Sequence, residues 1–256
     1  MTAPNPAGPT TPTVTYGHAS EIGSRDSQED AYDMARHLDE SGGYVVAAIA
    51  DGVGSHLIAD AAVKAVCALG ATADYQFDPE QLITLAAAVL PLHAEYADVE
   101  RWRIFEQFTY GDAYGHRTNA TIAVVTIGPD SSVCAGWLGD CRVYVRVADG
   151  RLIQLTQDHN LGKIGRPDKL TRSLATPGEG PQRATWSPTG GPKHTPIQVL
   201  LTTDGAHEAI PHRAIRYALQ HAPNSQRAAR WLTTWAVRAA GRDADNATAI
   251  VLGIAH

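Results

Sequence analysis

Short acidic motifs stand beside apolar, strand-like runs of this sequence, and their oxygen atoms could bind divalent cations. The first motif is Gln28-Glu29-Asp30. The others are Asp51-Gly52 after the run YVVAAIA, Gly139-Asp140 after CAGWL, Asp204-Gly205 after VLLTT, and Asp245-Asn246 before the final apolar run. A buried strand carries an aspartate to a fixed place at its end. An adjacent glycine lets the backbone approach closely, so that a carbonyl oxygen can also act as a ligand.

Carboxylates brought together in this way repel one another and shift each other's pKa, and divalent cations remove that conflict. Oxygen-only ligands favour Mg²⁺ or Mn²⁺ over zinc. A single Asp-Gly after a strand is usually only a turn, and Asp149-Gly150 is interpreted in that way. The recurrence of the pattern nevertheless favours a metal site.

The elements that must position these motifs can be predicted from hydrophobic patterning. The expected strands are 44–50, 121–127, 133–138, 143–147, 152–156, 199–203 and 249–254. The expected helices are 58–73, 79–99, 211–221 and 225–240. The strands do not alternate with helices, which disfavours a doubly wound parallel sheet and favours antiparallel sheets with helices packed outside.

Composition is typical of a globular protein with one large domain or two small ones. Hydrophobic residues make up 44% of the 256 residues, which suffices for a sizeable core. Residues 1–13 are rich in proline and are expected to form a disordered tail, and 14–256 to form the folded domain.

Charge and cysteine content predict a cytoplasmic protein. The net charge of −6, without a basic run, argues against nucleic acid or a membrane surface as a partner. The three cysteines lack metal-binding spacing and are interpreted as free thiols in a reducing compartment. We find no apolar stretch long enough for a membrane helix and no signal peptide.

Taken together, the motifs resemble those of the metal-dependent protein phosphatases of the PPM (type 2C) family, in order, over roughly residues 14–256. The matching stretches are GSRDSQEDAY, AAIADGVGSH, GWLGDCRVYVRVADGRLIQLTQDHNL, LLTTDGAHEAI and DADNATAIV. The resemblance implies an α+β fold, a four-layer αββα sandwich of two antiparallel sheets flanked by helices. It also implies a phosphoprotein phosphatase that acts on phosphoserine and phosphothreonine proteins, and a partner kinase in the same pathway.

The resemblance assigns roles to individual residues. Asp51 would bridge two Mg²⁺ or Mn²⁺ ions, with the Gly52 carbonyl on one ion and Asp204 and Asp245 on the other. Glu29 and Asp30 would hold metal-bound waters, and Arg25 would clamp the substrate phosphate. Asp140 matches the residue that helps to hold a third, weaker ion in bacterial members, and a turn cap is an equal alternative for it. Two supporting roles are expected as well, for Asn246 in the Asp245 loop and for His159 in its own loop.

The expected reaction is direct attack of a metal-bridging water on phosphorus, because two cations can lower the pKa of such a water and stabilise an in-line displacement. The leaving alkoxide needs a proton. Some family members place a histidine directly after the Asp-Gly pair, but here that position is Val53. A metal-bound water is the preferred acid, and His56 is the alternative.

The interval between His159 and Asp204 departs from the family, because bacterial relatives usually carry a helical flap there. Its many prolines and glycines predict an irregular loop, a more open cleft, and Trp186 packed beneath what remains of the flap.

Two other hypotheses about the function remain. One is a non-catalytic relative that binds phosphoproteins, against which the presence of all three metal aspartates argues. The other is a different oxygen-ligated hydrolase or a magnesium-binding scaffold.

Overall fold

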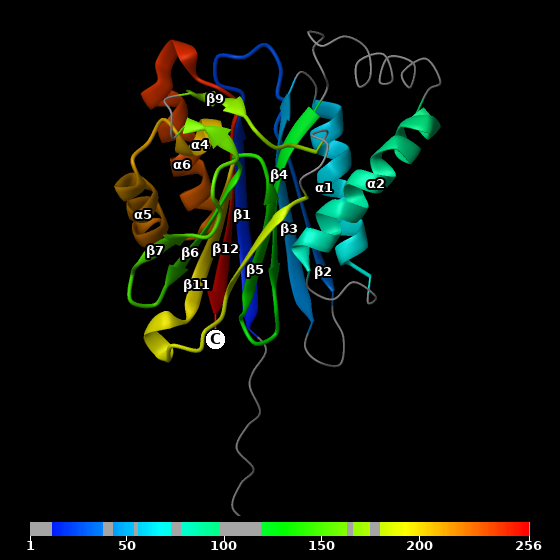
Figure 1. Cartoon of the computed structure of the whole chain (residues 1–256). Coiled ribbons are helices and arrows are strands. Elements are labelled where there is room, and N and C mark those ends of the chain that lie inside the picture. Colours follow the sequence, from blue (N-terminus) through cyan, green and yellow to red (C-terminus); the bar gives the residue numbers. More distant parts are fainter. Residues whose placement is uncertain are drawn as a thin grey trace, which may run out of the picture.

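Two five-stranded antiparallel sheets face each other at the centre of the molecule (Figure 1). The computed structural model describes residues 12–37, 43–53, 56–72, 78–97, 119–162, 166–174 and 180–255. The first sheet has the order β1 (Thr13–Glu21), β12 (Ala247–Ala255), β11 (Pro196–Thr202), β6 (Arg142–Val147) and β7 (Leu152–Gln154). The second has the order β10 (Gln182–Trp186), β5 (Val133–Leu138), β4 (Asn119–Ile127), β3 (Tyr44–Val53) and β2 (Ala31–His37).

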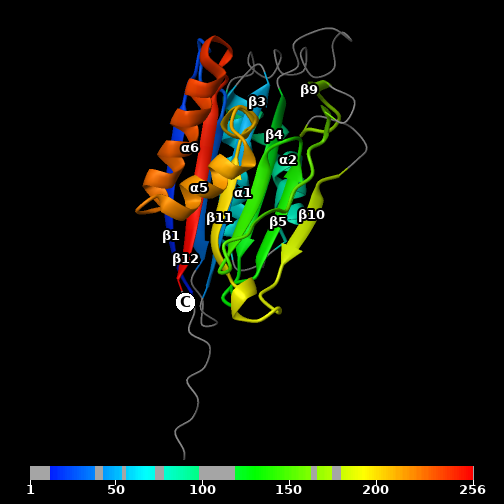
Figure 2. The same ribbon diagram turned by 90° about the vertical axis from the view of Figure 1, so that its left-hand side faces the viewer.

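Helices cover the outer faces of both sheets and complete four layers. On the second sheet lie α1 (His56–Gly70) and α2 (Pro79–Ala97), at the right of Figure 1. On the first lie α5 (His212–His221) and α6 (Ser225–Ala240), which face the viewer in Figure 2. Short elements join these layers: α4 (Asp204–His207), the pair β8 (Asn160–Leu161) and β9 (Arg166–Leu170), and two 3-10 turns, Pro192–His194 and Gly241–Asp243. The predicted αββα sandwich is confirmed.

The central strands are buried on both faces because the two core layers use alternate residues. In β3, Val45, Ala47 and Ile49 point between the sheets, whereas Val46 and Ala48 pack toward α1 and α2. This explains why the strand appears in the sequence as a continuous apolar run without a polar alternation. A third apolar cluster fixes α5 and α6 on the first sheet.

Most predicted elements are present, with shifted ends. The helix 225–240 has the predicted bounds; its Asn224 side chain accepts a hydrogen bond from the Arg227 amide, and it ends at Gly241, whose φ is 65°. The expected strand 152–156 ends at Gln154. The strands β1, β2 and β10 were not predicted. The proposed tail lies almost wholly outside the described residues.

Between His159 and Asp204, the structure differs from two of the sequence predictions. No α-helix occurs in the described residues of this interval, as predicted, but the interval is not merely irregular, since β8 pairs with β9 and β10 adds an edge strand to β5. Trp186 does not lie beneath a flap. It pairs with Val133 at the start of β5, the end remote from Asp140, and its ring nitrogen donates to the His194 carbonyl over 3.0 Å.

Two further sequence expectations can be compared with the structure. All three cysteines, Cys67, Cys134 and Cys141, are free. Of the helices in the described part of the chain, none combines the length and the apolar character that a membrane crossing requires.

Candidate metal centre

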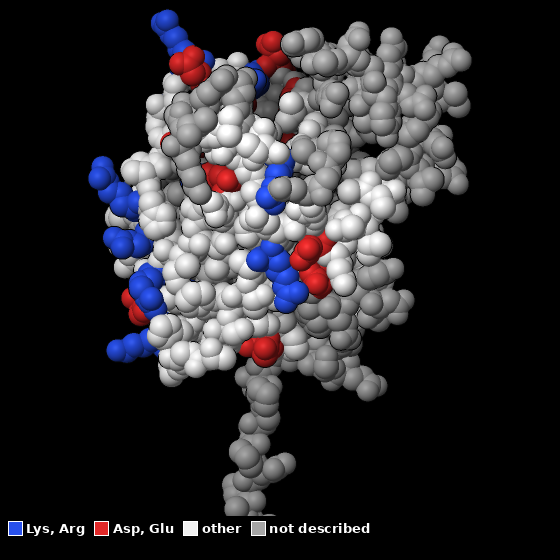
Figure 3. Space-filling model, viewed as in Figure 1, with Lys and Arg blue, Asp and Glu red and all other residues white. Residues whose placement is uncertain are grey.

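The acidic motifs meet in one cleft at the end of the sandwich where β3, β5 and β11 end. The cleft has a volume of about 640 Å³, and acidic side chains are visible in the hollow near the top of Figure 3. Its lining includes most of the predicted site residues: Arg25, Glu29, Asp51, Gly52, Asp140, Asp204 and Asp245. Asp30 lies buried directly behind them. What each of these residues binds remains a prediction.

Asp51 and Asp204 both line this cleft, and the carboxyl group of each influences the pKa of the other. Burial, reinforced by the charge of Asp204, raises the pKa of Asp51 well above its ordinary value. Burial and the charge of Asp245 likewise raise the pKa of Asp204. Two neighbouring carboxyl groups repel each other when both are ionised, and a divalent cation bound between them would remove that repulsion.

Asp30 is held in place by Thr203, which lies between β11 and α4, and Thr248 of β12 supports Thr203. The Thr203 hydroxyl donates to Asp30 Oδ2 over 2.9 Å and accepts from the Thr248 amide over 3.0 Å. The other oxygen, Oδ1, is buried without a hydrogen-bond partner in the described part of the chain. Burial raises the pKa of Asp30 to about 7. An unsatisfied buried carboxylate oxygen is costly, and one beside other carboxylates suits a ligand such as a cation or its water.

Asp140 reaches the cleft on a tight turn after β5. Gly139 has a φ of 105°, and its amide donates to His159 Nδ1 over 3.1 Å while its carbonyl accepts from the His159 amide over 2.9 Å. His159 therefore fixes this turn, as expected. Burial, followed by the charge of Asp204, raises the pKa of Asp140 to about 7, although a hydrogen bond from Asn160 opposes the shift.

Asp245 and the Arg25 loop are joined by Asn246. The Asn246 amide group donates to the carbonyls of Ile22 and Ser27 over 2.8 and 3.0 Å, and its oxygen accepts from the Glu29 amide over 2.7 Å. Asn246 thus supports its loop, as predicted, and it also shapes the segment that carries Arg25 and Glu29. The Arg25 side chain lies at the exposed rim and is ion-paired with Asp245.

Two glycines allow the backbone to approach this loop closely. A Cβ on Gly205 would lie 2.1 Å from the Asn246 carbonyl oxygen, and one on Gly23 would lie 2.2 Å from the Asp245 carbonyl oxygen. No side chain fits at either distance. The glycine after Asp204 is therefore required by the packing of α4 against the last metal motif.

The donor set fits hard divalent cations, since every clustered ligand is a carboxylate or carbonyl oxygen. Among the residues that the structure describes, no three acidic, imidazole or thiol side chains close on one point as a preformed chelate. Burial is the largest cause of the raised pKa values of Asp30, Asp51, Asp140 and Asp204, and repulsion from other carboxyl groups of the cleft adds to it. Carboxylates spaced around a cleft suit ions that keep part of their water shell, as Mg²⁺ does.

Some residues at the site have no distinctive sequence signal. Glu208 lines the cleft, and burial raises its pKa. Thr203 and Thr248 support Asp30, but threonine in a strand is ordinary. Arg142 binds both oxygens of Asp158, over 2.9 and 2.5 Å, beside the cleft. His56 is the exposed first residue of α1 and is not among the described residues that line the cleft.

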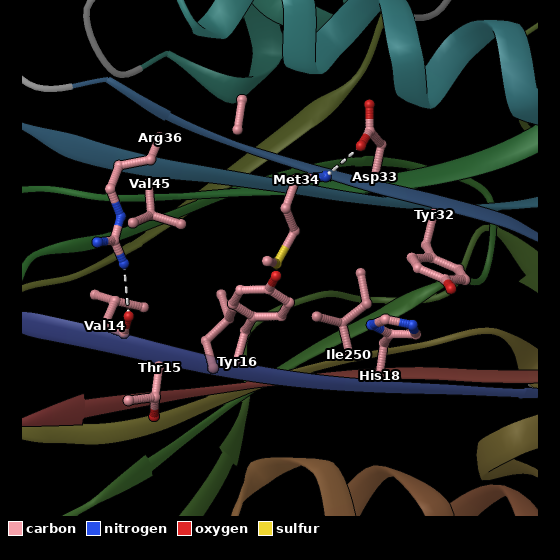
Figure 4. A pocket seen from close by; sticks show the side chains of 12 residues that line it. Val14, Thr15, Tyr16, His18, Tyr32, Asp33, Met34, Arg36, Val45 and Ile250 are labelled. Atoms are coloured by element: carbon pink, nitrogen blue, oxygen red, sulfur yellow. Dashed lines mark hydrogen bonds between the residues drawn. The ribbon is translucent and has the colours of Figure 1, made fainter.

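A second hollow, of about 620 Å³, opens between the edge strands β1 and β2 (Figure 4). Its lining is mainly apolar and aromatic, with Tyr16, Tyr32, Met34 and Ile250. Its one acidic residue, Asp33, accepts a hydrogen bond from the Met34 amide. It lacks the clustered carboxylates of the first cleft, which therefore remains the candidate site.

Comparison with known proteins agrees with this geometry. The family model described as Protein phosphatase 2C matches residues 19–248. The catalytic domain of the serine/threonine phosphatase PstP, in complex with two manganese ions, is 19% identical, with a TM-score of 0.71 over 96% of this chain and 100% of that one. Stp1 from Staphylococcus aureus is 15% identical, with a TM-score of 0.71 over 95% and 96%. The S. agalactiae serine/threonine phosphatase is 17% identical, with a TM-score of 0.70 over 94% of this chain and 99% of that one. A comparison with curated protein sequences gave no match.

Proposed function

The chain belongs to the protein phosphatase 2C family and is a metal-dependent serine/threonine protein phosphatase, and we propose that its clustered aspartates hold the Mg²⁺ or Mn²⁺ ions. Asp51, Asp204, Asp245 and the Gly52 carbonyl would bind two ions. Asp140 would take part in a third, weaker site. The single observation that carries this proposal is that Asp51, Gly52, Asp140, Asp204 and Asp245, which come from distant parts of the chain, line one cleft.

Bound divalent cations supply positive charge and activate water for attack on phosphorus. The chain's own residues then have three tasks. Asp51, near the end of β3, and Asp204, at the start of α4, would hold the cations. Asp30, held by Thr203, and Glu29 orient water within the cleft. Arg25, at the rim, binds the phosphoryl oxygens, because a guanidinium fork matches their geometry.

No side chain is assigned as the proton donor to the leaving alkoxide. His56 is exposed at the start of α1, outside the described lining of the cleft. We therefore propose that a water in the cleft supplies this proton, and that replacing His56 leaves turnover largely intact.

The biological setting is inferred from composition. We propose a cytoplasmic protein in a phosphorylation signalling pathway, opposing a partner kinase. The free state of Cys67, Cys134 and Cys141 supports a reducing compartment. We also propose that residues 14–256 act as one phosphatase domain, in keeping with the family match over 19–248.

Hydrolysis of p-nitrophenyl phosphate and of a phosphoserine peptide in Mn²⁺ tests the assignment of the metal ligands. Asp204→Asn removes one charge from the pair Asp51 and Asp204 and should lower turnover by ~10³-fold or more, as expected when a group that stabilises the transition state is lost. Asp149→Asn is the matched control, because Asp149 also precedes a glycine but lies in the β6–β7 turn. Equal activity of Asp204→Asn and wild type would overturn the assignment.

A further inference from the structure

Positive charge is concentrated on the outer face of α5 and α6. Between Ala209 and Arg242 the sequence has six arginines and no aspartate or glutamate, although the whole chain carries −6. The arginines are all exposed: Arg213, Arg216, Arg227, Arg230, Arg238 and Arg242. Helical spacing separates them, so no basic run marks this face in the sequence. In Figure 3, the upper blue side chains at the left-hand edge lie at the level of α5, whereas the lower ones lie at the level of the β6–β7 turn and the Pro192–His194 turn in Figure 1. Figure 2 turns this side toward the viewer.

These arginines are not used in ion pairs within the described part of the chain. Glu21 accepts a hydrogen bond from Thr234 of α6 over 3.3 Å, and Glu208 directly precedes the arginine-rich segment. Asp243 follows directly after the arginine-rich segment. The positive charge of the face is therefore largely uncompensated by the protein itself.

A seam of aromatic rings runs between the two helices. The Tyr217 ring lies 4.1 Å from His221 and 6.3 Å from Trp235, and Trp235 lies 5.5 Å from Trp231. Tyr217 is 53% exposed, whereas both tryptophans are half-buried. The two tryptophan rings are therefore partly covered by their surroundings, and Tyr217 is the most exposed of these three rings.

Arginines flank this seam at helical spacing. Arg213 precedes Tyr217 by four residues, and Arg227 precedes Trp231 by four, so each arginine lies beside a ring on its helix surface. Arg238 follows Trp235 by three. We refer to the aromatic seam and the exposed arginines of α5 and α6 together as the α5–α6 strip.

Helix stability does not account for this arrangement. Arg213 and Arg227 stand in the first turns of α5 and α6, and neither first turn has an acidic residue. Cations at a helix N-terminus are unfavourable because they face the positive end of the macrodipole. Arg238, in the last turn of α6, does complement the macrodipole. Binding to a partner is therefore the better explanation for Arg213 and Arg227.

We propose that the α5–α6 strip docks an acidic, phosphorylated segment of the protein substrate, outside the catalytic cleft. The proposal rests on the phosphatase activity above. Arginine forks pair with phosphate and carboxylate groups, and exposed arginine clusters recognise phosphorylated or acidic motifs. A membrane surface is disfavoured, since Tyr217 is the one large exposed apolar side chain of the strip among the described residues.

Docking would act on substrate capture rather than on chemistry. α5 begins at His212, shortly after α4 and Asp204, so a substrate held on the strip is tethered to the molecule that carries the cleft. Tethering raises the effective concentration of a second phosphorylated site. The expected effect is on KM for multiply phosphorylated proteins, with kcat unchanged.

The test is binding of a short peptide that carries two phosphoserines among glutamates, measured by fluorescence anisotropy in EDTA, where no turnover occurs. The variant is Arg213→Glu/Arg227→Glu, which places acids at helix N-termini and should not impair folding. The control is Lys64→Glu/Lys193→Glu, the same change in net charge on exposed residues outside α5 and α6: Lys64 lies on α1, where it is paired with Asp60, and Lys193 lies in the Pro192–His194 turn. Hydrolysis of p-nitrophenyl phosphate in Mn²⁺ is measured in parallel.

We expect the arginine variant to bind the peptide about tenfold more weakly or worse, as reversed charges at an interface do, while the control binds like wild type and all three proteins hydrolyse p-nitrophenyl phosphate equally. Unchanged peptide binding by the arginine variant would overturn the proposal. Tighter binding of wild type to an oligothymidylate, or to phosphatidylserine vesicles, would overturn it in favour of those ligands. Absence of p-nitrophenyl phosphate hydrolysis in every protein would count against the phosphatase assignment alone, since the EDTA measurement does not depend on turnover.

Discussion

Asp140 shows how a single buried carboxyl group links the site to stability. Its pKa is raised to about 7 by burial, followed by the charge of Asp204. A carboxyl group with a raised pKa in the folded state contributes stability that is fully present below its unfolded pKa and is lost as pH rises through the folded value. In the metal-free protein, the contribution of Asp140 to the free energy of unfolding should therefore be smaller at pH 8 than at pH 5.

Asp140→Asn removes the titration and should stabilise the protein in EDTA by an amount that grows with pH. About two pH units separate pH 5 from the folded pKa, so the gain should increase by up to roughly 3 kcal/mol between pH 5 and pH 8. Urea unfolding at both pH values measures it. A stability difference that is the same at both values would contradict the buried, ionisable state of Asp140.

At the scale of elements, the packing of α4 against the Asp245 loop depends on Gly205. A methyl group there would lie 2.1 Å from the Asn246 carbonyl oxygen, and backbone must move to admit it. Gly205→Ala should cost roughly 1–3 kcal/mol, the usual range for overpacking, and should also lower activity because it shifts Asp204 and Asp245 apart.

Gly180→Ala is the matched control, because a Cβ on Gly180 meets nothing within 4 Å. Urea unfolding and p-nitrophenyl phosphate hydrolysis should both distinguish the two variants. If Gly205→Ala were as stable and as active as Gly180→Ala, the close approach would not matter for the site.

The elements that sequence predicts well are those with their own local signals. YVVAAIA has the apolar length of a buried strand, and helix 225–240 carries Asn224 and Gly241 at its ends. β1 and β2 lack such a signal, since they are edge strands with exposed polar residues, and β10 follows a glycine- and proline-rich segment. The carboxylates of the cleft could be named from the sequence, but their threonine supports come from tertiary packing, which single-residue patterns do not encode.

For the whole molecule, cation binding should couple to folding. A ligand at ~100 times its dissociation constant adds ~2.7 kcal/mol to the free energy of unfolding. For a chain of this size that corresponds to a rise in melting temperature of about 5–10 °C. We expect this rise when Mn²⁺ replaces EDTA, measured by differential scanning calorimetry at constant ionic strength.

The rise should itself depend on pH. Cations bind ionised carboxylates, whereas the metal-free cluster loses stability as Asp30 and Asp140 ionise around pH 7. His207 acts in the opposite sense, because burial lowers its pKa and favours folding at higher pH. Since His207 is taken to contribute equally with and without cation, the difference in melting temperature between Mn²⁺ and EDTA reports on the carboxylates. This difference should be larger at pH 8 than at pH 6.

Asp204→Asn should abolish most of that difference in melting temperature. A melting temperature that Mn²⁺ leaves unchanged at both pH values would mean that the cluster does not hold cations strongly.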